Sequence, residues 1–188
     1  MDRDNRFHTS LLGGAALLAM VTFSLVAAAK LNKTGSSSTS FKAAGPAGLS
    51  IEGTTADMTV ADDGTTVTIT IPLANIDTGI GLRNEHTKKA LEVGTYPTTT
   101  LTVARSALKF PAAGAESSGD AKGSLTLHGQ TKDISFHYVA KLNGNTYEVK
   151  GTSKINVDDF GVKRPSYLGV TVKPDVDLTT AFQAQDNP

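Results

Sequence analysis

The chain has 188 residues, of which 39% are hydrophobic, so it is long enough for one domain with a sizeable buried core. Eighteen Lys and Arg residues balance eighteen Asp and Glu residues, and this neutrality argues against the basic face that a nucleic-acid partner requires. The chain contains no cysteine, which excludes disulfide bonds, thiol catalysis, cysteine-linked lipids and Cys-ligated metals.

An uncharged apolar run, LLGGAALLAMVTFSLVAAA, occupies residues 11–29 and follows Arg3 and Arg6. Its end resembles the small-residue site at which signal peptides are cleaved, and its length is close to the ~20 residues that span a bilayer. Residues 1–29 are therefore either a cleaved signal peptide or a retained membrane anchor, and both alternatives predict an exported protein of the periplasm or cell envelope. Because the rest of the chain is neutral, we expect membrane contact only through this segment, if it is uncleaved.

A run of small polar residues, KTGSSSTS, follows at Lys33–Ser40 and has the composition of a flexible tether. We therefore expect a flexible linker over residues 30–40 and a folded domain over residues 41–184.

Short runs rich in Val, Ile and Thr alternate with turn signals along this domain. In residues 66–73 the apolar side chains occupy every second position, which is the period of a half-buried strand. Eight antiparallel strands can close on themselves and remove the exposed sheet edges, so the pattern predicts an all-β, eight-stranded barrel. The predicted strands lie near residues 47–53, 55–61, 65–73, 97–106, 120–128, 133–142, 145–157 and 168–182.

Hairpin signals set the predicted register of three of these strands. Asn143-Gly144 is a strong signal for a tight turn, and a turn centred there pairs Leu142 with Asn145. A second predicted turn pairs Leu127 with Ile134. The apolar residues of all three strands then share the inner face of the barrel, which a wrong assignment would rarely achieve.

The same register assigns the remaining side chains to a face. His128 and His137 are expected on the outer face, as ordinary solvated histidines. Gly151 and Ser153 are expected on the inner face opposite large residues, which leaves room for a hollow interior. A change of phase after the strand at 97–106 predicts a β-bulge near Arg105.

Residues 83–91, RNEHTKKAL, favour the only helix of the domain, with Asn84 as its N-cap. This helix would cover one end of the barrel. Arg83 and His86 lie three residues apart on one face of it, where they would either contact a ligand head group or brace the helix. Arg164, before Pro165, is a further candidate for the mouth of the cavity.

No arrangement of residues indicates catalysis. The sequence contains no nucleophile elbow, phosphate-binding loop, dinucleotide fingerprint or zinc-protease motif. Asp158 and Asp159 are adjacent, but neighbouring side chains of a strand point to opposite faces and cannot act as an acid–base pair. We therefore expect no enzyme activity, no metal and no cofactor.

Residues 73–104, LANIDTGIGLRNEHTKKALEVGTYPTTTLTVA, resemble the signature of the YceI-like, polyisoprenoid-binding proteins. In those proteins a strand ends in Ser/Asn-Ile-Asp-Thr-Gly, and a short helix and a Tyr-Pro pair come before the next strand. Residues 123–132 (GSLTLHGQTK) and 155–161 (INVDDFG) are similar to two further segments of the family, in the same order. The resemblance extends from Phe41 to Phe182.

Two positions depart from the family pattern. Asn84 and Glu85 stand where an Asp usually follows the Arg of the helix, and Asn156 or Val157 replaces the usual Arg before Asp-Phe-Gly. The second change removes a candidate head-group contact and leaves the apolar interior untouched.

The resemblance implies an exported, lipocalin-like barrel that holds a long isoprenoid chain in its interior. On this basis we expect a binding protein whose partner is an apolar or amphiphilic small molecule or lipid. The residues expected to contact this ligand are Val67, Ile69, Ile71, Leu101, Val103, Leu125, Leu127, Ile134, Phe136, Tyr138, Tyr147, Val149, Ile155, Phe160, Tyr167, Arg83 and His86.

Two other classes remain open at this point. The inward residues could pack solely against one another, which would describe a cell-envelope interaction or structural barrel with a solid core. The barrel could also be an enzyme that acts on a lipid-like substrate, although the predicted register places no His, Asp or Glu on the inner face. The sequence indicates neither the identity of the ligand nor an oligomeric state.

Overall fold

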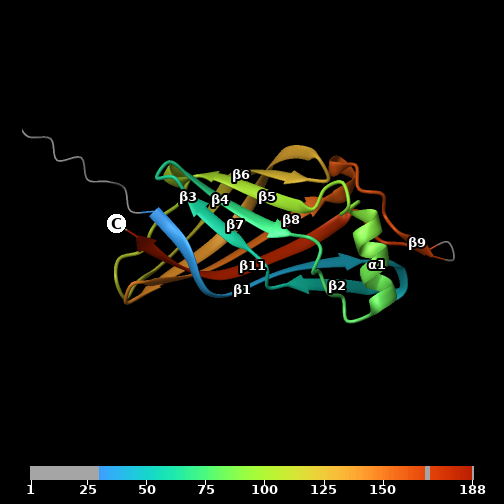
Figure 1. Cartoon of the computed structure of the whole chain (residues 1–188), viewed down its shortest axis with the longest axis horizontal. Coiled ribbons are helices and arrows are strands. Elements are labelled where there is room, and N and C mark those ends of the chain that lie inside the picture. The colour runs from blue at the N-terminus through green and yellow to red at the C-terminus, as the bar shows by residue number, and fades with distance from the viewer. Residues whose placement is uncertain (1–29, 168–169, 188) are drawn as a thin grey trace, which may run out of the picture.

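A computed structural model describes residues 30–167 and 170–187 of the chain. Nine antiparallel strands form one sheet in the order β2-β1-β11-β8-β7-β6-β5-β4-β3 (Figure 1). Their bounds are β1 Lys30–Ala44, β2 Ser50–Thr55, β3 Thr59–Asp62, β4 Thr66–Pro72, β5 Thr98–Ala104, β6 Glu116–Leu127, β7 Gln130–Asn143, β8 Thr146–Asn156 and β11 Asp175–Asn187.

The remaining elements cover the ends of this sheet. One α-helix, α1 (Gly81–Ala90), lies across one end, which is the right-hand end in Figure 1. A two-stranded ribbon of β9 (Ser166–Tyr167) and β10 (Val170–Thr171) lies at the same end. Three short 3₁₀ turns complete the described fold: η1 Pro46–Gly48, η2 Arg105–Ala107 and η3 Val157–Phe160.

The sheet curls until its two edges meet. The edge strands β2 and β3 are separated by only three residues of chain, and Ser37 Oγ donates a hydrogen bond of 2.6 Å to the Ala56 carbonyl oxygen in that connection. Farther along, the Leu31 N–H of β1 donates to Asp62 Oδ2 of β3 over 3.1 Å. The predicted all-β antiparallel barrel with one short helix is therefore confirmed, and each of the eight predicted strands corresponds to an observed one.

The ninth strand, β1, occupies the segment that we expected to be a flexible linker. Residues 30–40 are not a linker: they belong to a 15-residue strand that pairs with β11, and from Thr39 onward also with β2. The pairing shifts between Thr34 and Ser37, where Gly35 adopts a φ of 57°. A Ser/Thr-rich run can form this strand because its main chain hydrogen-bonds to its neighbours whatever the side chains are.

Both hairpin turns are displaced from their predicted positions, and the β6–β7 turn is also tighter than predicted. The β7–β8 turn consists of Gly144 and Asn145, so that Leu142 pairs with Tyr147 and not with Asn145. The β6–β7 turn consists of His128 and Gly129, so that Leu127 pairs with Gln130 and not with Ile134. The predicted registers are therefore wrong by two and four residues, but even shifts leave the side chains of the paired strand residues on their predicted faces.

His128 does not have the outer-face strand position that we predicted. It lies in the β6–β7 turn with a φ of 51°, followed by Gly129 at 72°, and this pair of positive φ values is typical of a type I′ turn. His137 does lie on the outer surface, where its Nδ1 is 2.9 Å from Asp120 Oδ1.

The helix begins two residues earlier than predicted. Its N-cap is Ile80, not Asn84. The Asn84 side chain braces the preceding loop: its amide oxygen accepts a hydrogen bond of 2.7 Å from the Thr78 N–H, and its amide nitrogen donates to Asp77 Oδ1 over 2.9 Å. The irregularity expected near Arg105 is the 3₁₀ turn η2 and not a β-bulge.

The predicted signal peptide or anchor, residues 1–29, lies outside the described residues. Within residues 30–167 and 170–187, none of the helices has the length and apolar character needed to cross a membrane.

Replacing Thr39 by Pro tests the assignment of β1. Thr39 pairs with Thr180 of β11 and Thr55 of β2, so proline would interrupt the ladder in the interior of the sheet. We expect the free energy of unfolding to fall by about 3 kcal/mol, measured by urea denaturation. Thr39→Val, which suits a strand, should have little effect; an equally harmless Thr39→Pro would show that this segment is a linker after all.

Candidate ligand-binding cavity

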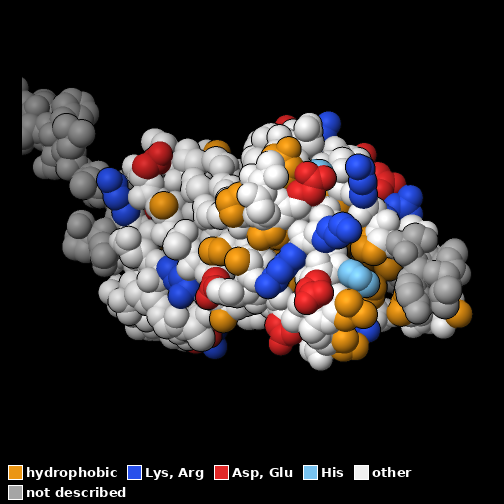
Figure 2. Space-filling view, turned by 45° about the vertical axis from the view of Figure 1, so that its right-hand side comes forward, with side chains coloured by type: hydrophobic (Ala, Val, Ile, Leu, Met, Phe, Trp, Pro, Cys, Tyr) orange, Lys and Arg blue, Asp and Glu red, His pale blue; other side chains and the backbone are white. Residues whose placement is uncertain are grey.

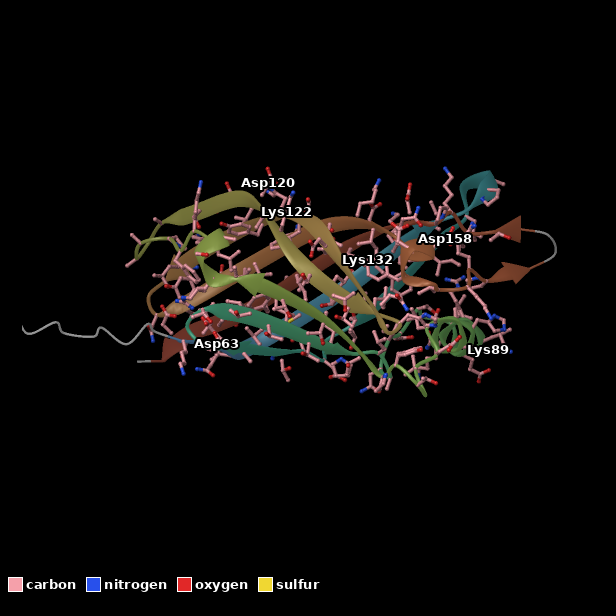
Figure 3. All side chains as sticks on the ribbon, turned by 90° about the horizontal axis from the view of Figure 1, so that it is seen from above. Asp63, Lys89, Asp120, Lys122, Lys132 and Asp158 are labelled. Carbon is pink, nitrogen blue, oxygen red and sulfur yellow. The ribbon has the colours of Figure 1, made fainter. Side chains whose placement is uncertain are left out.

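A cavity of about 310 Å³ lies inside the barrel, within the size range of small-molecule sites. Its walls are side chains from the inner faces of the strands, and they are almost entirely apolar. The charged side chains labelled in Figure 3 lie outside the barrel: Asp63, Lys89, Asp120, Lys122, Lys132 and Asp158 are all exposed. The alternation along the strands thus separates a charged exterior from an apolar interior.

Thirteen of the seventeen predicted ligand residues line this cavity. They are Val67, Ile69, Ile71, Leu101, Val103, Leu125, Leu127, Ile134, Phe136, Tyr138, Tyr147, Val149 and Ile155. The prediction missed the lining residues of β1 and of the inner face of β11, such as Phe41, Leu178 and Phe182, although Phe41 lay in the predicted domain and the other two in a predicted strand. The alternation of Phe41 and Ala43, both inward, was the signal that could have revealed them.

The other four predicted residues do not line the cavity where their side chains are described. Phe160 is only 2% exposed and packs in the core beside the barrel, because it belongs to η3 and not to a strand. Arg83 and His86 lie on α1, half-buried and exposed respectively. The cavity is instead lined by Thr87 and Ala90 of α1 and by its C-cap, Leu91. Tyr167 is part of β9, but its side chain lies outside the described part of the structure.

The cavity exists because small residues on the inner face of β8 lie opposite large residues of β7. Gly151 pairs with Tyr138, and Ser153 pairs with Phe136, on the inner face of β7 and β8. A Cβ atom placed on Gly151 would have a single neighbour within 4 Å, the His137 carbonyl oxygen at 3.9 Å. No side chain therefore fills this part of the interior, and the core is hollow as the sequence suggested.

One end of the cavity, below α1, is bordered by cations. Arg164 lines it together with Pro165 and Lys173. The Arg164 guanidinium is held in place, because Nε donates to Asp158 Oδ1 over 2.8 Å and Nη1 donates to the Val172 carbonyl oxygen over 2.9 Å. Arg164, which the sequence suggested as a candidate for the cavity mouth, is therefore one of the lining residues.

The opposite end is closed by a buried polar cluster that the sequence did not reveal. Arg105 forms an ion pair with Asp62, whose side chain is fully buried, and its Nη2 lies 3.7 Å from Asp186 Oδ1. Asp62 also accepts hydrogen bonds from the main chain of Leu31 and Gly64, over 3.1 and 2.8 Å. Together, Arg105 and Asp62 therefore link β1, β3, β11 and η2.

Two aromatic residues complete this polar end. The Tyr147 hydroxyl donates a hydrogen bond of 2.9 Å to Asp186 Oδ2, and burial, followed by this hydrogen bond, raises the pKa of Tyr147. The Phe110 ring covers Arg105, with 4.2 Å between the guanidinium carbon and the ring centroid. Only the folded chain brings these residues together, so no spacing in the sequence could have indicated the cluster.

His128 serves structure rather than chemistry. Its ring packs on Tyr96 with 4.8 Å between the centroids, and its Nδ1 lies 3.2 Å from the Phe160 carbonyl oxygen, which requires the proton on Nδ1. Its Nε2 lies 3.4 Å from Glu92 Oε1. These contacts fasten the β6–β7 turn to η3 and to the loop after α1.

A metal-binding site would need several His, Asp or Glu side chains close together. Across the described residues, no three His, Asp or Glu side chains converge closely enough to bind one. The described walls of the cavity contain no His, Asp or Glu at all.

Comparison with known proteins places the chain in a family. The model of the YceI-like domain matches residues 24–184, so the protein belongs to the YceI-like family. A UPF0312 protein of Pseudomonas syringae pv. tomato is 31% identical over 125 residues, which cover 60% of this chain and 59% of that protein. The chain therefore spans about three fifths of the curated relatives that it matches.

Solved structures share the fold at low sequence identity. A polyisoprenoid-binding domain from Saccharophagus degradans, implicated in plant cell wall breakdown, superimposes with a TM-score of 0.70 at 18% identity, covering 85% of this chain and 99% of that domain. BcnA of Burkholderia cenocepacia superimposes with a TM-score of 0.64 at 19% identity, covering 79% of this chain and 96% of BcnA. These likenesses confirm the lipocalin-like architecture of the YceI proteins.

Replacing Asp62 by Asn tests the polar end of the barrel. The substitution leaves the largely buried Arg105 without its principal counter-charge, so we expect the free energy of unfolding to fall by about 3 kcal/mol in urea denaturation. Glu52→Gln is the matched control, because it breaks the exposed Lys42–Glu52 ion pair of 2.8 Å and should change nothing measurable. Equal stabilities of the two variants would contradict a structural role for the cluster.

Proposed function

We propose that the protein binds an apolar or amphiphilic chain, such as a polyisoprenoid-like lipid, in the interior of the barrel. The observation that carries the proposal is the cavity of about 310 Å³ with almost wholly apolar walls. Water molecules form few favourable interactions in such an apolar cavity. Each methylene group of a ligand that moves from water into it contributes about 0.8 kcal/mol to the free energy of binding. The likeness of the fold to a domain described as polyisoprenoid-binding is a second, weaker support.

A binding function is better supported than an enzymatic one. The charged residues on the described cavity walls are Lys109, Arg164 and Lys173, and all three border its ends. A reaction on the apolar chain would need a proton donor or acceptor near the middle of the cavity, where the polar groups are hydroxyls such as those of Thr39 and Thr180. The alternative of a solid-core envelope protein is disfavoured by the space beside Gly151.

Export is part of the same proposal. A soluble carrier is needed where a water-insoluble chain must leave its bilayer, and residues 1–29 have the composition of a signal peptide or anchor. We therefore place the barrel in the periplasm or cell envelope. Fractionation of cells that produce the protein, with mass determination of its N-terminus, would test both the location and the cleavage after Ala29; a cytoplasmic, unprocessed chain would refute this part.

The first test of ligand binding works whatever the chemical identity of the ligand. Protein purified without detergent should release a lipid on denaturation and organic extraction, at a fixed ratio to protein in mass spectrometry. Protein stripped of that lipid should take up a polyprenol and melt at a higher temperature, because the ligand binds only the folded state. An empty extract, together with no uptake and no shift in melting temperature, would refute the proposal.

A second test fills the cavity. Gly151→Leu adds a side chain where only one atom lies within 4 Å of the new Cβ, so the fold should persist while the ligand space is lost. We expect polyprenol binding to weaken at least tenfold, which corresponds to about 1.4 kcal/mol. Lys150→Leu adds the same side chain to the exposed face of the same strand and should bind normally. Equal binding by both variants would show that the ligand lies elsewhere.

A further inference from the structure

The N-terminal end of α1 carries two apolar side chains that are largely exposed. Leu82 is 64% exposed and Ile80 is 50% exposed, which makes them the most exposed large hydrophobic residues in the described part of the chain. Cβ atoms built on their neighbours Gly79 and Gly81 would have no atom within 4 Å. Figure 2 turns this end toward the viewer and shows hydrophobic side chains at its surface, beside a histidine and several Lys or Arg side chains.

The helix that carries this apolar tip is also cationic. α1 contains Arg83, Lys88 and Lys89 against the single acid Glu85, so its net charge is 3 − 1 = +2 in a chain whose net charge is zero. The segment after η3 adds Lys163 and Lys173 to this charge, since residues 161–173 contain no Asp or Glu and their third cation, Arg164, is paired with Asp158.

The acidic residues nearest to α1 already have partners within the barrel. Asp77 accepts hydrogen bonds from Asn84 and from the Gly79 N–H, and these lower the pKa of its carboxyl group. Glu92 lies against His128, and Asp158 is paired with Arg164. Only Asp158 is paired with a cation among them, so the positive charge of this end rests on the Lys and Arg side chains of α1 itself.

The opposite face of the same helix forms part of the cavity wall. Thr87, Ala90 and Leu91 line the cavity, while Leu82 and Lys89 face solvent. The helix that carries the exposed tip is therefore also a wall of the cavity that Arg164 and Lys173 line. A surface that contacts the tip would lie beside a helix that borders the apolar interior.

We propose that the α1 end of the barrel docks on an anionic lipid bilayer, with Ile80 and Leu82 inserted among the head groups and the cations of α1 above them. Exposed apolar side chains next to Lys and Arg are the combination that holds peripheral proteins at such interfaces. The surface departs from the expectation that only residues 1–29 meet a membrane. Its purpose rests on the proposed function, since docking would bring the cavity to the bilayer from which an apolar chain is taken up.

The absence of tryptophan from the chain permits a local test. Leu82→Trp places a single fluorescent reporter at the tip of α1, and Ala113→Trp places one in an exposed loop at the opposite end, next to the β7–β8 hairpin. The full-length variants are mixed with an excess of vesicles of phosphatidylcholine and phosphatidylglycerol that contain brominated acyl chains. We expect a blue shift and strong quenching for Trp at position 82 and neither for Trp at position 113.

A second pair of variants separates insertion from mere proximity. With Ile80→Trp as the reporter, adding Leu82→Glu should weaken vesicle binding roughly tenfold, because an anion replaces the inserted apolar group. Vesicles of phosphatidylcholine alone should bind more weakly than the anionic ones. Equal quenching at positions 82 and 113, no quenching at either, or no effect of Leu82→Glu would overturn the proposal.

Two further outcomes are decisive. A blue shift of Trp at position 82 that appears on concentrating the protein without vesicles would assign the patch to contact with a second copy of the chain, against the proposal. In the Gly151→Leu background the quenching should persist, since docking does not require an occupied cavity. If the unsubstituted protein binds no ligand but position 82 is quenched, only the carrier function is refuted; if it binds ligand but position 82 is not quenched, only the docking is refuted.

Discussion

Asp62 joins the two margins of the curled sheet, because it accepts a hydrogen bond from Leu31 of β1 and also forms the buried ion pair with Arg105, and the hollow barrel depends on that junction. A barrel with a filled core is held by packing across its middle, but here the middle is a cavity. Apolar packing is instead divided into two clusters, one around Phe160 and Leu73 and one around Leu31, Val67 and Phe182. The polar cluster adds directional bonds where β1 and β3 would otherwise only touch.

The inner wall of the cavity could be predicted because its pattern survives errors of register. Our two hairpin registers were wrong by even numbers of residues, so residues such as Phe136 and Tyr138 kept their inward face. The alternation of Val67, Ile69 and Ile71 gave the same information for β4. A period of two is a local property, which is why neighbouring residues suffice to read it.

The features that escaped prediction depend on distant partners. The Ser/Thr-rich start of β1 has no apolar alternation of its own and becomes a strand by hydrogen bonding to β11, at the other end of the chain. Arg105 acquires its role only beside Asp62 and Asp186. His128 changed from an outer-face residue to a packed one because its turn is two residues long, and its partner Phe160 lies 32 residues away.

The start of β1 at Lys30 also fixes the direction in which the chain first runs along the barrel. The strand begins at Lys30, immediately after the apolar run ends, and leads from the end of the barrel that Arg105 closes toward the end that α1 covers (Figure 1). Fifteen residues of extended chain measure up to about 50 Å. A chain whose residues 11–29 stayed in one bilayer would hold α1 at the far end of this spacer, facing a different surface, whereas a chain released from that segment could turn α1 toward any membrane.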